Sequence, residues 1–488
     1  MHEQSINHQP SFIVLSQEIL DALAAIVGER EIISEPEELI VYECDAYTLE
    51  KDAPVAVVFP RSVEQVIRVI RYLYEKKIPF LARGAGTGLS GGCIPAKGGV
   101  IIGMNKMSQI LEIDYRNRRV VVEPGVVNLW VTNAVSPKGY LYAPDPSSQM
   151  ACTIGGNVAE NSGGPNTLKY GVTTNHTLGM EFILPNGDRI DIGGKAEDMP
   201  GYDLTGLVVG SEGTFGICTK ATIQIIRQPQ TYRTMLGVFE SIDDATQTVS
   251  DIIASGILPA ALEMMDQLII KAVEEAFQFG FPLDAKAVLI IELDGLEAGI
   301  DEQAGRIMDI CHQNNAREVS QAATDEERMA LWASRKKAFG AMGRLAPNYC
   351  TQDGVIPRTK LPGMLRFISK LSEKYDVRIA NVFHAGDGNL HPILLYDERD
   401  ADLVRRTLKA SGEILEECIR LGGSVTGEHG IGIEKVSYMP KMFSPEDLSV
   451  MAALKKIFNP EDLLNPHKIF PDSRICMEPR MLNKQVPA

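Results

Sequence analysis

The hydrophobic pattern of this chain changes near residue 230. Before that point, short apolar runs alternate with glycine-rich stretches, which indicates short strands joined by loops. After it, apolar residues recur three and four residues apart over long segments, as in amphipathic helices. Strands are predicted at 55–60, 78–82, 119–123 and 287–293. Helices are predicted at 16–27, 62–77, 243–255, 264–277, 297–314, 325–344, 360–375, 400–421 and 444–458; the one at 62–77 opens with a capping box, Ser62-Val-Glu-Gln65.

A chain of 488 residues is too long for one hydrophobic core, so two or three domains are expected. With the main boundary near residue 230, we divide the chain into four parts. They are an N-terminal helical segment (1–50), a glycine-rich domain (51–229), a second domain (230–443) and a C-terminal tail (444–488).

Charge and cysteine content narrow the functional class. The net charge of −16 argues against binding to nucleic acid or to an anionic membrane surface. No apolar run reaches the roughly 18 residues of a membrane span, and residues 1–7 lack the features of a signal peptide. The eight cysteines form no Cys-x-x-Cys motif, so no disulfide framework, structural zinc site or iron–sulfur cluster is predicted. We expect a cytoplasmic protein.

Two histidines flank a predicted hairpin in the second domain. The apolar runs 377–384 and 390–395 enclose Asp387-Gly388, a pair typical of a type I′ turn. That turn would place His384 directly opposite His391, with their Cβ atoms about 5 Å apart on one face. With Glu428, from Gly427-Glu-His-Gly-Ile-Gly432, the pair would form an open metal site for zinc, manganese or iron. The alternative is a polar groove that binds no metal.

Three glycine-rich stretches lie in the first domain. Gly86-Thr-Gly-Leu-Ser-Gly91 matches the dinucleotide-binding pattern, but the glycines and the proline that follow prevent the helix that a Rossmann loop must open. A helix-free loop can still hold a pyrophosphate through its backbone N–H groups; a plain surface loop is the alternative. Two further glycine-rich loops, 154–165 and 203–217, favour a large planar ligand that the backbone approaches at several points.

These motifs resemble those of a known family. Pro60-Arg-Ser-Val63, 83–92, 155–164 and 210–216 are similar to the FAD-binding domain of flavoproteins of the vanillyl-alcohol oxidase type. More specifically, Pro144-Asp-Pro-Ser-Ser148, Leu262-Glu-Met-Met-Asp266, 384–392 and 427–432 resemble the FAD-linked D subunit of bacterial glycolate oxidase, a relative of D-lactate and D-2-hydroxyglutarate dehydrogenases. The resemblance implies an α+β fold: a two-part FAD-binding domain of the p-cresol methylhydroxylase (PCMH) type, a separate α/β cap with an antiparallel sheet and helices, and a C-terminal helical tail.

The resemblance also implies the site residues. Its metal ligands correspond to His384, His391 and Glu428, and its catalytic base to His429. Arg335, on an apolar helix face, would bind the substrate carboxylate; the alternative partner is a structural Asp or Glu, and Lys336 and Lys337 are expected to be solvated. Non-covalent FAD would be held by Arg83, Gly84, Ala85, Gly86, Thr87, Gly88, Leu89, Ser90, Gly91, Pro144, Asp145, Ser148, Gly155, Gly156, Asn157, Asn161, Gly163, Gly164, Gly213, Ile217 and Asn465.

The implied reaction is the oxidation of a small 2-hydroxy acid, with glycolate to glyoxylate as the first expectation. The metal would lower the pKa of the hydroxyl, His429 would take its proton, and the hydride would go to flavin N5. The implied partners are an iron–sulfur subunit and a second flavin-binding subunit, which could place the chain at the inner membrane peripherally. Alternatives are a D-lactate or other D-2-hydroxy-acid dehydrogenase acting alone, a non-catalytic flavoprotein scaffold and, more weakly, an NAD-linked dehydrogenase.

Overall fold

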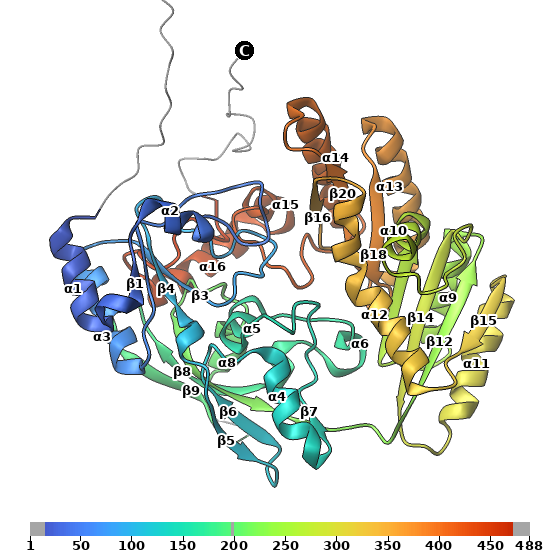
Figure 1. Cartoon of the computed structure of the whole chain (residues 1–488), viewed down its shortest axis with the longest axis horizontal. Coiled ribbons are helices and arrows are strands. Elements are labelled where there is room, and N and C mark those ends of the chain that lie inside the picture. Colours follow the sequence, from blue (N-terminus) through green and yellow to red (C-terminus); the bar gives the residue numbers. More distant parts are fainter. Residues whose placement is uncertain (1–14, 197–199, 472–488) are drawn as a thin grey trace, which may run out of the picture.

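The two parts of the chain that differ in hydrophobic pattern fold around separate cores (Figure 1). The computed structural model describes residues 15–196 and 200–471, so the first 14 residues and the last 17 lie outside it. Buried residues before 226 form two of the large clusters, and buried residues between 235 and 418 form two others. Leu463 and Leu464 return to the first core, which carries the tail back across the molecule.

The first part contains two main sheets and a short one. In the first, β2, β4 and β3 are parallel and β1 pairs antiparallel with β2. The second is antiparallel, in the order β5-β6-β10-β8-β9, and β7 pairs with β11. The strands are β1 (Ile32–Ile33), β2 (Ala56–Val58), β3 (Phe80–Arg83), β4 (Val100–Gly103), β5 (Ile110–Asp114), β6 (Arg119–Val122), β7 (Tyr140–Leu141), β8 (Thr177–Ile183), β9 (Arg189–Gly193), β10 (Ile217–Gln224) and β11 (Ile226–Arg227).

Mostly short helices connect these strands. The longest, α3, begins as its sequence predicts, because the Ser62 hydroxyl accepts a hydrogen bond from Gln65 N at 3.3 Å. The Gln65 side chain accepts from Arg61 N instead of Ser62 N, so the capping box is only half formed. The helices are α1 (Gln17–Val27), α2 (Pro36–Leu39), α3 (Val63–Glu75), α4 (Asn128–Val135), α5 (Ile154–Glu160), α6 (Thr167–Tyr170), α7 (Thr173–His176) and α8 (Leu204–Val208).

The second part is built on an antiparallel sheet. Its strand order is β15-β12-β14-β13-β18-β19-β17, and β20 pairs with both β18 and β16. The strands are β12 (Thr231–Phe239), β13 (Ala261–Asp266), β14 (Ala287–Gly295), β15 (Glu318–Gln321), β16 (Asn348–Thr351), β17 (Gly354–Val355), β18 (Ile379–His384), β19 (Asn389–Leu390) and β20 (Pro392–Tyr396).

Helices cover both faces of this sheet. Apolar residues of one face pack with α9, α11, α13 and α14, and those of the other face pack with α10 and α12. The predicted helix at 264–277 begins only at Gln267, because Met264 to Asp266 complete β13 and Asp266 caps the helix. The helices are α9 (Ile242–Ala254), α10 (Gln267–Phe277), α11 (Ile300–Gln313), α12 (Asp325–Ala341), α13 (Leu361–Tyr375) and α14 (Ala401–Arg420).

The tail joins the second part to the first. Helices α15 (Met439–Met442) and α16 (Pro445–Phe458) lie beside the first part in Figure 1. The Phe458 ring stacks on Phe215 with centroids 4.7 Å apart, and Asn465 N donates to Phe80 O. No helix within the described residues is long and apolar enough to cross a membrane. The expected α+β class, with an antiparallel cap sheet and a helical tail, is confirmed.

Candidate active site

The two hairpin histidines lie on one face of the sheet, but they are not directly opposite each other. His384 pairs with Asn389, and residues 385–388 form a four-residue turn instead of the predicted two-residue turn. Gly388 has a φ of 82° whereas Asp387 does not adopt a positive φ, so a type I′ turn does not form. The register differs from the prediction by two residues, which returns side chains to the same face. The two imidazole centroids are 5.2 Å apart.

His384, His391 and Glu428 converge on one point. Each imidazole Nε2 lies close to Glu428 Oε1, at 3.3 Å for His384 and 3.1 Å for His391. On the other side of each ring, His384 Nδ1 is 2.7 Å from Glu263 Oε1 and His391 Nδ1 is 3.3 Å from Gln352 O. Because those acceptors favour protons on Nδ1, both Nε2 lone pairs face the Glu428 carboxylate.

Such an arrangement needs a cation at its centre. A divalent metal bound by both Nε2 atoms and the carboxylate would supply it, and each histidine would donate its other N–H to an oxygen, as metal-bound histidines usually do. A proton is the other possibility. Burial lowers the pKa of His384, but the carboxylates of Glu263 and Glu428 outweigh it and raise that pKa well above the usual value. The donor set therefore fits a metal.

Arg335 lies behind this set instead of in the cavity. Its Nε donates to Glu263 Oε2 at 2.6 Å, and its side chain is 1% exposed. Glu263 pairs with His384 across β13 and β18, so one buried carboxylate holds both Arg335 and His384. The sequence analysis left open a structural Asp or Glu as the partner of Arg335, and Glu263 is such a partner. Arg335 Nη2 has no hydrogen-bond partner among the described residues.

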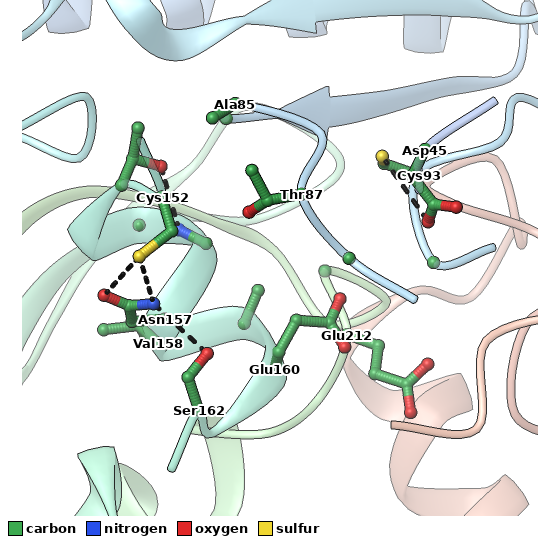
Figure 2. Close-up of a pocket in the computed structure, with 18 of the residues that line it drawn as sticks. Asp45, Ala85, Thr87, Cys93, Cys152, Asn157, Val158, Glu160, Ser162 and Glu212 are labelled. Carbon is green, nitrogen blue, oxygen red and sulfur yellow. Dashed lines mark hydrogen bonds between the residues drawn. The ribbon is translucent and has the colours of Figure 1, made fainter. Parts of the chain in front are cut away.

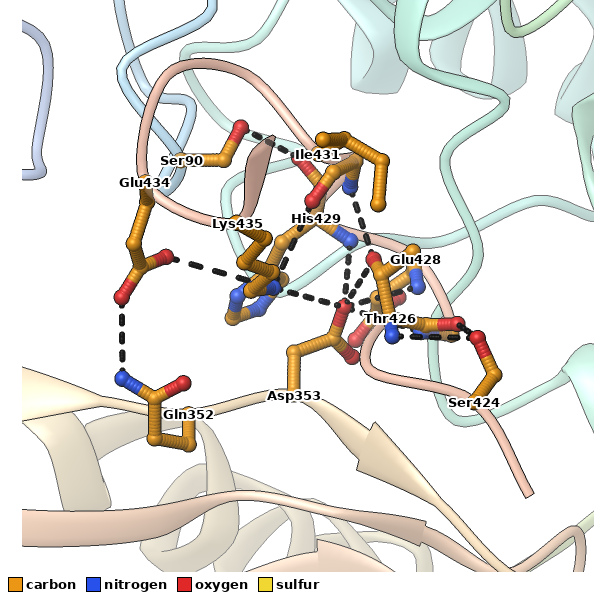
Figure 3. Close-up of polar contacts among 12 residues, drawn as sticks. Ser90, Gln352, Asp353, Ser424, Thr426, Glu428, His429, Ile431, Glu434 and Lys435 are labelled. Carbon is orange, nitrogen blue, oxygen red and sulfur yellow. Dashed lines mark hydrogen bonds and ion pairs between the residues drawn. The ribbon is translucent and has the colours of Figure 1, made fainter. Parts of the chain in front are cut away.

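Asp353 anchors the loop that carries Glu428 and His429 (Figure 3). Its Oδ2 accepts hydrogen bonds from Thr426 Oγ1 and from the backbone N–H groups of residues 427, 428 and 429, at 2.6 to 3.1 Å. Lys435 Nζ lies 3.6 Å from the same oxygen. One fully buried carboxylate thus fixes the backbone of two candidate active-site residues.

His429 faces the cavity beside these ligands. Its ring stacks on His391 with centroids 5.1 Å apart and an interplanar angle of 20°. Burial lowers the pKa of His429 to about 4, although the charge of Asp353 opposes this. The imidazole is therefore neutral near pH 7 and able to accept a proton. Its Nδ1 has no protein partner within the described chain.

A cavity of about 380 Å³ runs from this site into the first part of the structure (Figure 2). His391, Glu428 and His429 line one end. Much of the remaining wall is glycine backbone, and a Cβ added at Gly156 would contact only Thr153 Oγ1, at 3.4 Å. A wall of backbone suits a cofactor that must be approached closely. The expected FAD residues that line it are Gly84, Ala85, Gly86, Thr87, Gly88, Leu89, Ser148, Gly155, Gly156, Asn157, Gly213, Ile217 and Asn465.

The other expected FAD residues support the cavity from outside. Arg83 stacks on Tyr42, and Asn161 caps α5 and accepts hydrogen bonds from Thr174. Ser90 Oγ donates to His429 O at 2.8 Å, which ties the glycine loop to the loop of His429. The remaining ones, which pack against neighbouring backbone or side chains near the site, are Gly91, Pro144, Asp145, Gly163 and Gly164.

The second and third glycine-rich stretches are not simple loops. Residues 154–160 form α5 and 204–208 form α8, because Thr153 and Asp203 cap them. The first stretch, 84–99, has no helix, as expected. The glycines of α5 therefore bring a helix surface, and not a turn, to the cavity.

Comparisons with known proteins agree with this geometry. The model named "FAD binding domain" matches residues 54–193, and "FAD linked oxidases, C-terminal domain" matches 228–469. The chain is 45% identical over 460 residues to the glycolate oxidase subunit GlcD of Escherichia coli (strain K12), covering 94% of this chain and 92% of that protein. For GlcD of Bacillus subtilis (strain 168) the identity is 42% over 458 residues, with 94% and 97% covered. This chain is also 32% identical over 439 residues to a D-lactate dehydrogenase of Archaeoglobus fulgidus, covering 87% of this chain and 95% of that protein.

The chain belongs to the FAD-linked oxidases. The expectation of an FAD-dependent oxidoreductase is thus confirmed. Among solved structures, p-cresol methylhydroxylase with substrate bound has a TM-score of 0.79 at 19% identity, covering 94% of this chain and 98% of that one. Alkyldihydroxyacetonephosphate synthase has a TM-score of 0.74 at 17% identity, covering 95% and 86%. These likenesses confirm the PCMH-type fold.

Sequence reasoning missed three residues of this FAD-linked oxidase site. Glu263 stood within a motif that carried the resemblance, but nothing in its spacing showed that it would face His384. Asp353 lies on no recognisable motif. Glu160, at the end of α5, lines the cavity beside Glu212; burial and the charge of Glu212 raise the pKa of Glu160 well above its usual value.

Proposed function

We propose that this protein oxidises a small 2-hydroxy acid, with glycolate to glyoxylate as the principal reaction. One observation supports this most strongly: His391, Glu428 and His429 line the same cavity as the glycine backbone expected to hold FAD. A 2-hydroxy acid must lose a proton from its hydroxyl oxygen and a hydride from C2. In this cavity a proton acceptor (His429) and a candidate cation site lie beside the expected cofactor wall, as the removal of a proton and a hydride from one substrate requires.

In this proposal FAD is held non-covalently by the glycine-rich walls, and His384, His391 and Glu428 hold a divalent transition metal. When bound, FAD supplies a hydride acceptor, and the metal supplies a Lewis acid for the hydroxyl. His429 takes the hydroxyl proton, since its imidazole is neutral near pH 7. Glu263 fixes His384 through Nδ1, and Asp353 fixes the backbone of Glu428 and His429.

Arg335 remains our candidate for the substrate carboxylate. Its Nη2 is buried without a partner, while its Nε is held by Glu263. A guanidinium fixed on one side can offer its remaining N–H groups to a carboxylate in a defined direction. Arg335→Lys should weaken substrate binding more than it slows the limiting rate of flavin reduction.

A D-2-hydroxy-acid dehydrogenase with a preference for D-lactate is the second candidate, because a relative at 32% identity is named a D-lactate dehydrogenase. One methyl group in a pocket changes binding by only about 1–3 kcal/mol, so a related site could accept either acid. A non-catalytic scaffold is less well supported, since the acid–base and cation-binding groups are all present at one cavity.

Anaerobic flavin reduction separates these candidates. The oxidised flavin of the purified protein is mixed with glycolate, D-lactate, L-lactate or ethylene glycol without oxygen, and the loss of its visible absorbance is followed. We expect rapid bleaching by glycolate and none by ethylene glycol, which lacks a carboxylate. Faster bleaching by D-lactate would favour the second candidate, and no bleaching by any acid would favour the scaffold.

We also propose that electrons leave through partner subunits, one with an iron–sulfur cluster and one with a second flavin. The relatives at 42–45% identity are named as subunits of glycolate oxidase. Residues 1–488 contain no Cys-x-x-Cys spacing that could hold a cluster of their own. A docked partner at the inner membrane would then give the chain a peripheral location there.

A further inference from the structure

A lysine lies in the cavity wall at the end that contains the candidate active site. Lys336 lines the cavity together with Phe339, Tyr349 and the three residues His391, Glu428 and His429. Among the described residues of that wall, it is the only lysine or arginine. The sequence predicts a solvated residue here, and Lys336 is exposed, but its place in the cavity wall is an additional feature that needs an explanation.

The position of Lys336 on α12 gives it a different direction from Arg335. Consecutive helix residues point about 100° apart, so when Arg335 faces Glu263 of the sheet, Lys336 turns away from it. Phe339 neighbours both residues: it lies three residues after Lys336 and four after Arg335, whose guanidinium carbon is 5.9 Å from the centroid of its ring. The Phe339 ring is 6.4 Å from the His391 ring, in an edge-on arrangement. The lysine is therefore within one helical turn of a side chain that touches a candidate metal ligand.

Lys336 has no fixed partner in the protein. It makes no hydrogen bond or ion pair with any other described residue, although its charge lowers the pKa of the nearby Asp145 carboxyl in part. Burial raises the pKa of Asp145 to about 7, so this carboxyl is at best half ionised near neutral pH. Lys336 is thus a charged amine at a cavity wall without a matched counterion.

The next residue shows what an ordinary surface lysine does on this helix. Lys337 does not line the cavity, and its Nζ lies over two aromatic rings, 4.7 Å from the centroid of Phe277 and 5.8 Å from that of Phe279. Both lysines are exposed, and Ala338, the next residue of α12, is buried. They differ in that one faces the cavity and the other packs on the outer surface.

We infer that Lys336 is a second cation for the substrate carboxylate: it lines the cavity wall itself, whereas Arg335 is buried behind the residues of that wall. The inference rests on the proposed function, because it assumes that a 2-hydroxy acid binds beside His391 and His429. A flexible ammonium beside a guanidinium held by Glu263 suits a small acid with a single carboxylate: Arg335 fixes one direction, and Lys336 adapts to the other oxygen.

The experiment compares Lys336→Met with Lys337→Met. Saturation of anaerobic flavin reduction by glycolate gives an apparent substrate affinity and a limiting rate. Titration with oxalate, a dicarboxylate that cannot be oxidised in the same way, gives an affinity from the change in the flavin spectrum without turnover. Lys336→Met should weaken glycolate and oxalate binding roughly 10- to 100-fold, the usual effect of a hydrogen bond to a charged group. Its limiting rate and FAD content should change little.

Two further arms make the result specific. Lys336→Arg should recover most of the lost affinity, because it restores the positive charge. Glycolamide, which has no carboxylate, should bind Lys336→Met as it binds the unsubstituted protein. If the unsubstituted protein is not reduced by any 2-hydroxy acid, the proposed function fails first. If it is reduced, and Lys336→Met binds glycolate and oxalate as Lys337→Met does, the inference is wrong.

Discussion

At the scale of single residues, Glu263 organises Arg335 and His384. It accepts from Arg335 on one oxygen and meets His384 Nδ1 on the other, while it is itself fully buried. Loss of this buried carboxylate is costly, because it leaves the Arg335 guanidinium unpaired and the His384 Nδ1–H without its acceptor. Glu263 lies directly behind a candidate metal ligand, and its contact with His384 Nδ1 fixes the direction of the His384 Nε2 lone pair.

Glu263→Gln should therefore lose metal affinity by about 10- to 100-fold, the usual share of an outer-shell carboxylate. The measurement is metal bound per chain as a function of free metal. Glu292→Gln is the matched control, since Glu292 is also buried on this sheet and binds Arg328 and Trp332 of α12, away from the candidate ligands. Equal metal loss in both variants would mean that the effect comes from general destabilisation.

His429→Asn should slow flavin reduction by glycolate roughly 10²- to 10⁴-fold, as expected for a positioned base. Because burial lowers the pKa of His429 to about 4, the unsubstituted imidazole should be ready to accept a proton throughout the neutral range. Stopped-flow reduction at several pH values checks both points, with FAD and metal content measured in parallel. Unchanged reduction kinetics would assign the base to another residue.

How far the sequence predicted the site is clearest at this scale. Residues joined by short segments, such as His384 and His391, could be placed together from the hairpin alone. Asp353 and Glu263 could not, because each contacts site residues more than 70 positions away in sequence: Asp353 accepts from His429 N, and Glu263 pairs with His384 across two strands. Lys336 is exposed as predicted, but its place in the cavity wall could not be predicted, because that place depends on what α12 packs against.

At the scale of elements, the hairpin shows which parts of a prediction are robust. The predicted turn was two residues too short, yet both histidines stayed on one face because strand side chains repeat every two residues. An error of one residue would have separated them. Helix positions were predicted well where a cap and a long apolar stripe agreed. The helix prediction was wrong at 264–266, where the apolar run is equally typical of a buried strand and forms part of β13.

The glycines of α5 give a prediction at this scale. Gly156→Val should fold but bind FAD weakly, because a Cβ at this position meets only Thr153 Oγ1 at 3.4 Å and a larger side chain would extend into the cavity. Gly86→Val is a less clean test, since Gly86 has a φ of 70° and a Cβ there would lie 2.3 Å from Arg83 Nη2. The readout is flavin bound per chain after purification.

Gly305→Val in α11 is the control for Gly156→Val. It also puts valine at a helical glycine, but nothing lies within 4 Å of a Cβ there and the position is outside the cavity. A colourless Gly156→Val protein with a normal circular dichroism spectrum, beside a yellow Gly305→Val protein, would support the FAD assignment. Full flavin content in both variants would contradict it.

At the scale of the whole molecule, two separately folded parts meet at one cavity. The first supplies most of the wall expected to hold FAD, and the second supplies the candidate ligands, base and cations. Contacts such as Ser90 Oγ to His429 O, and Asn465 Nδ2 to Gly92 O at 3.0 Å, join the parts at the cavity edge. The candidate active site is therefore built from both parts and the returning tail.

The same organisation leads to a prediction about electron transfer. The purified chain should be reduced by glycolate in a single turnover but should turn over slowly with oxygen, because its physiological acceptor would be a partner subunit. An artificial dye should restore steady turnover, measured as glyoxylate formed per chain. Rapid turnover with oxygen alone, with release of hydrogen peroxide, would instead identify a self-sufficient oxidase.

We propose that a metal held by His384, His391 and Glu428 acts together with FAD on one substrate. The most direct measurement is anaerobic bleaching of the flavin by glycolate before and after the metal is removed with a chelator, with FAD content checked in both samples. We predict that the metal-depleted protein keeps its FAD, is no longer reduced, and recovers when zinc, manganese or iron is restored. Bleaching at an unchanged rate in protein shown to contain no metal would contradict the account.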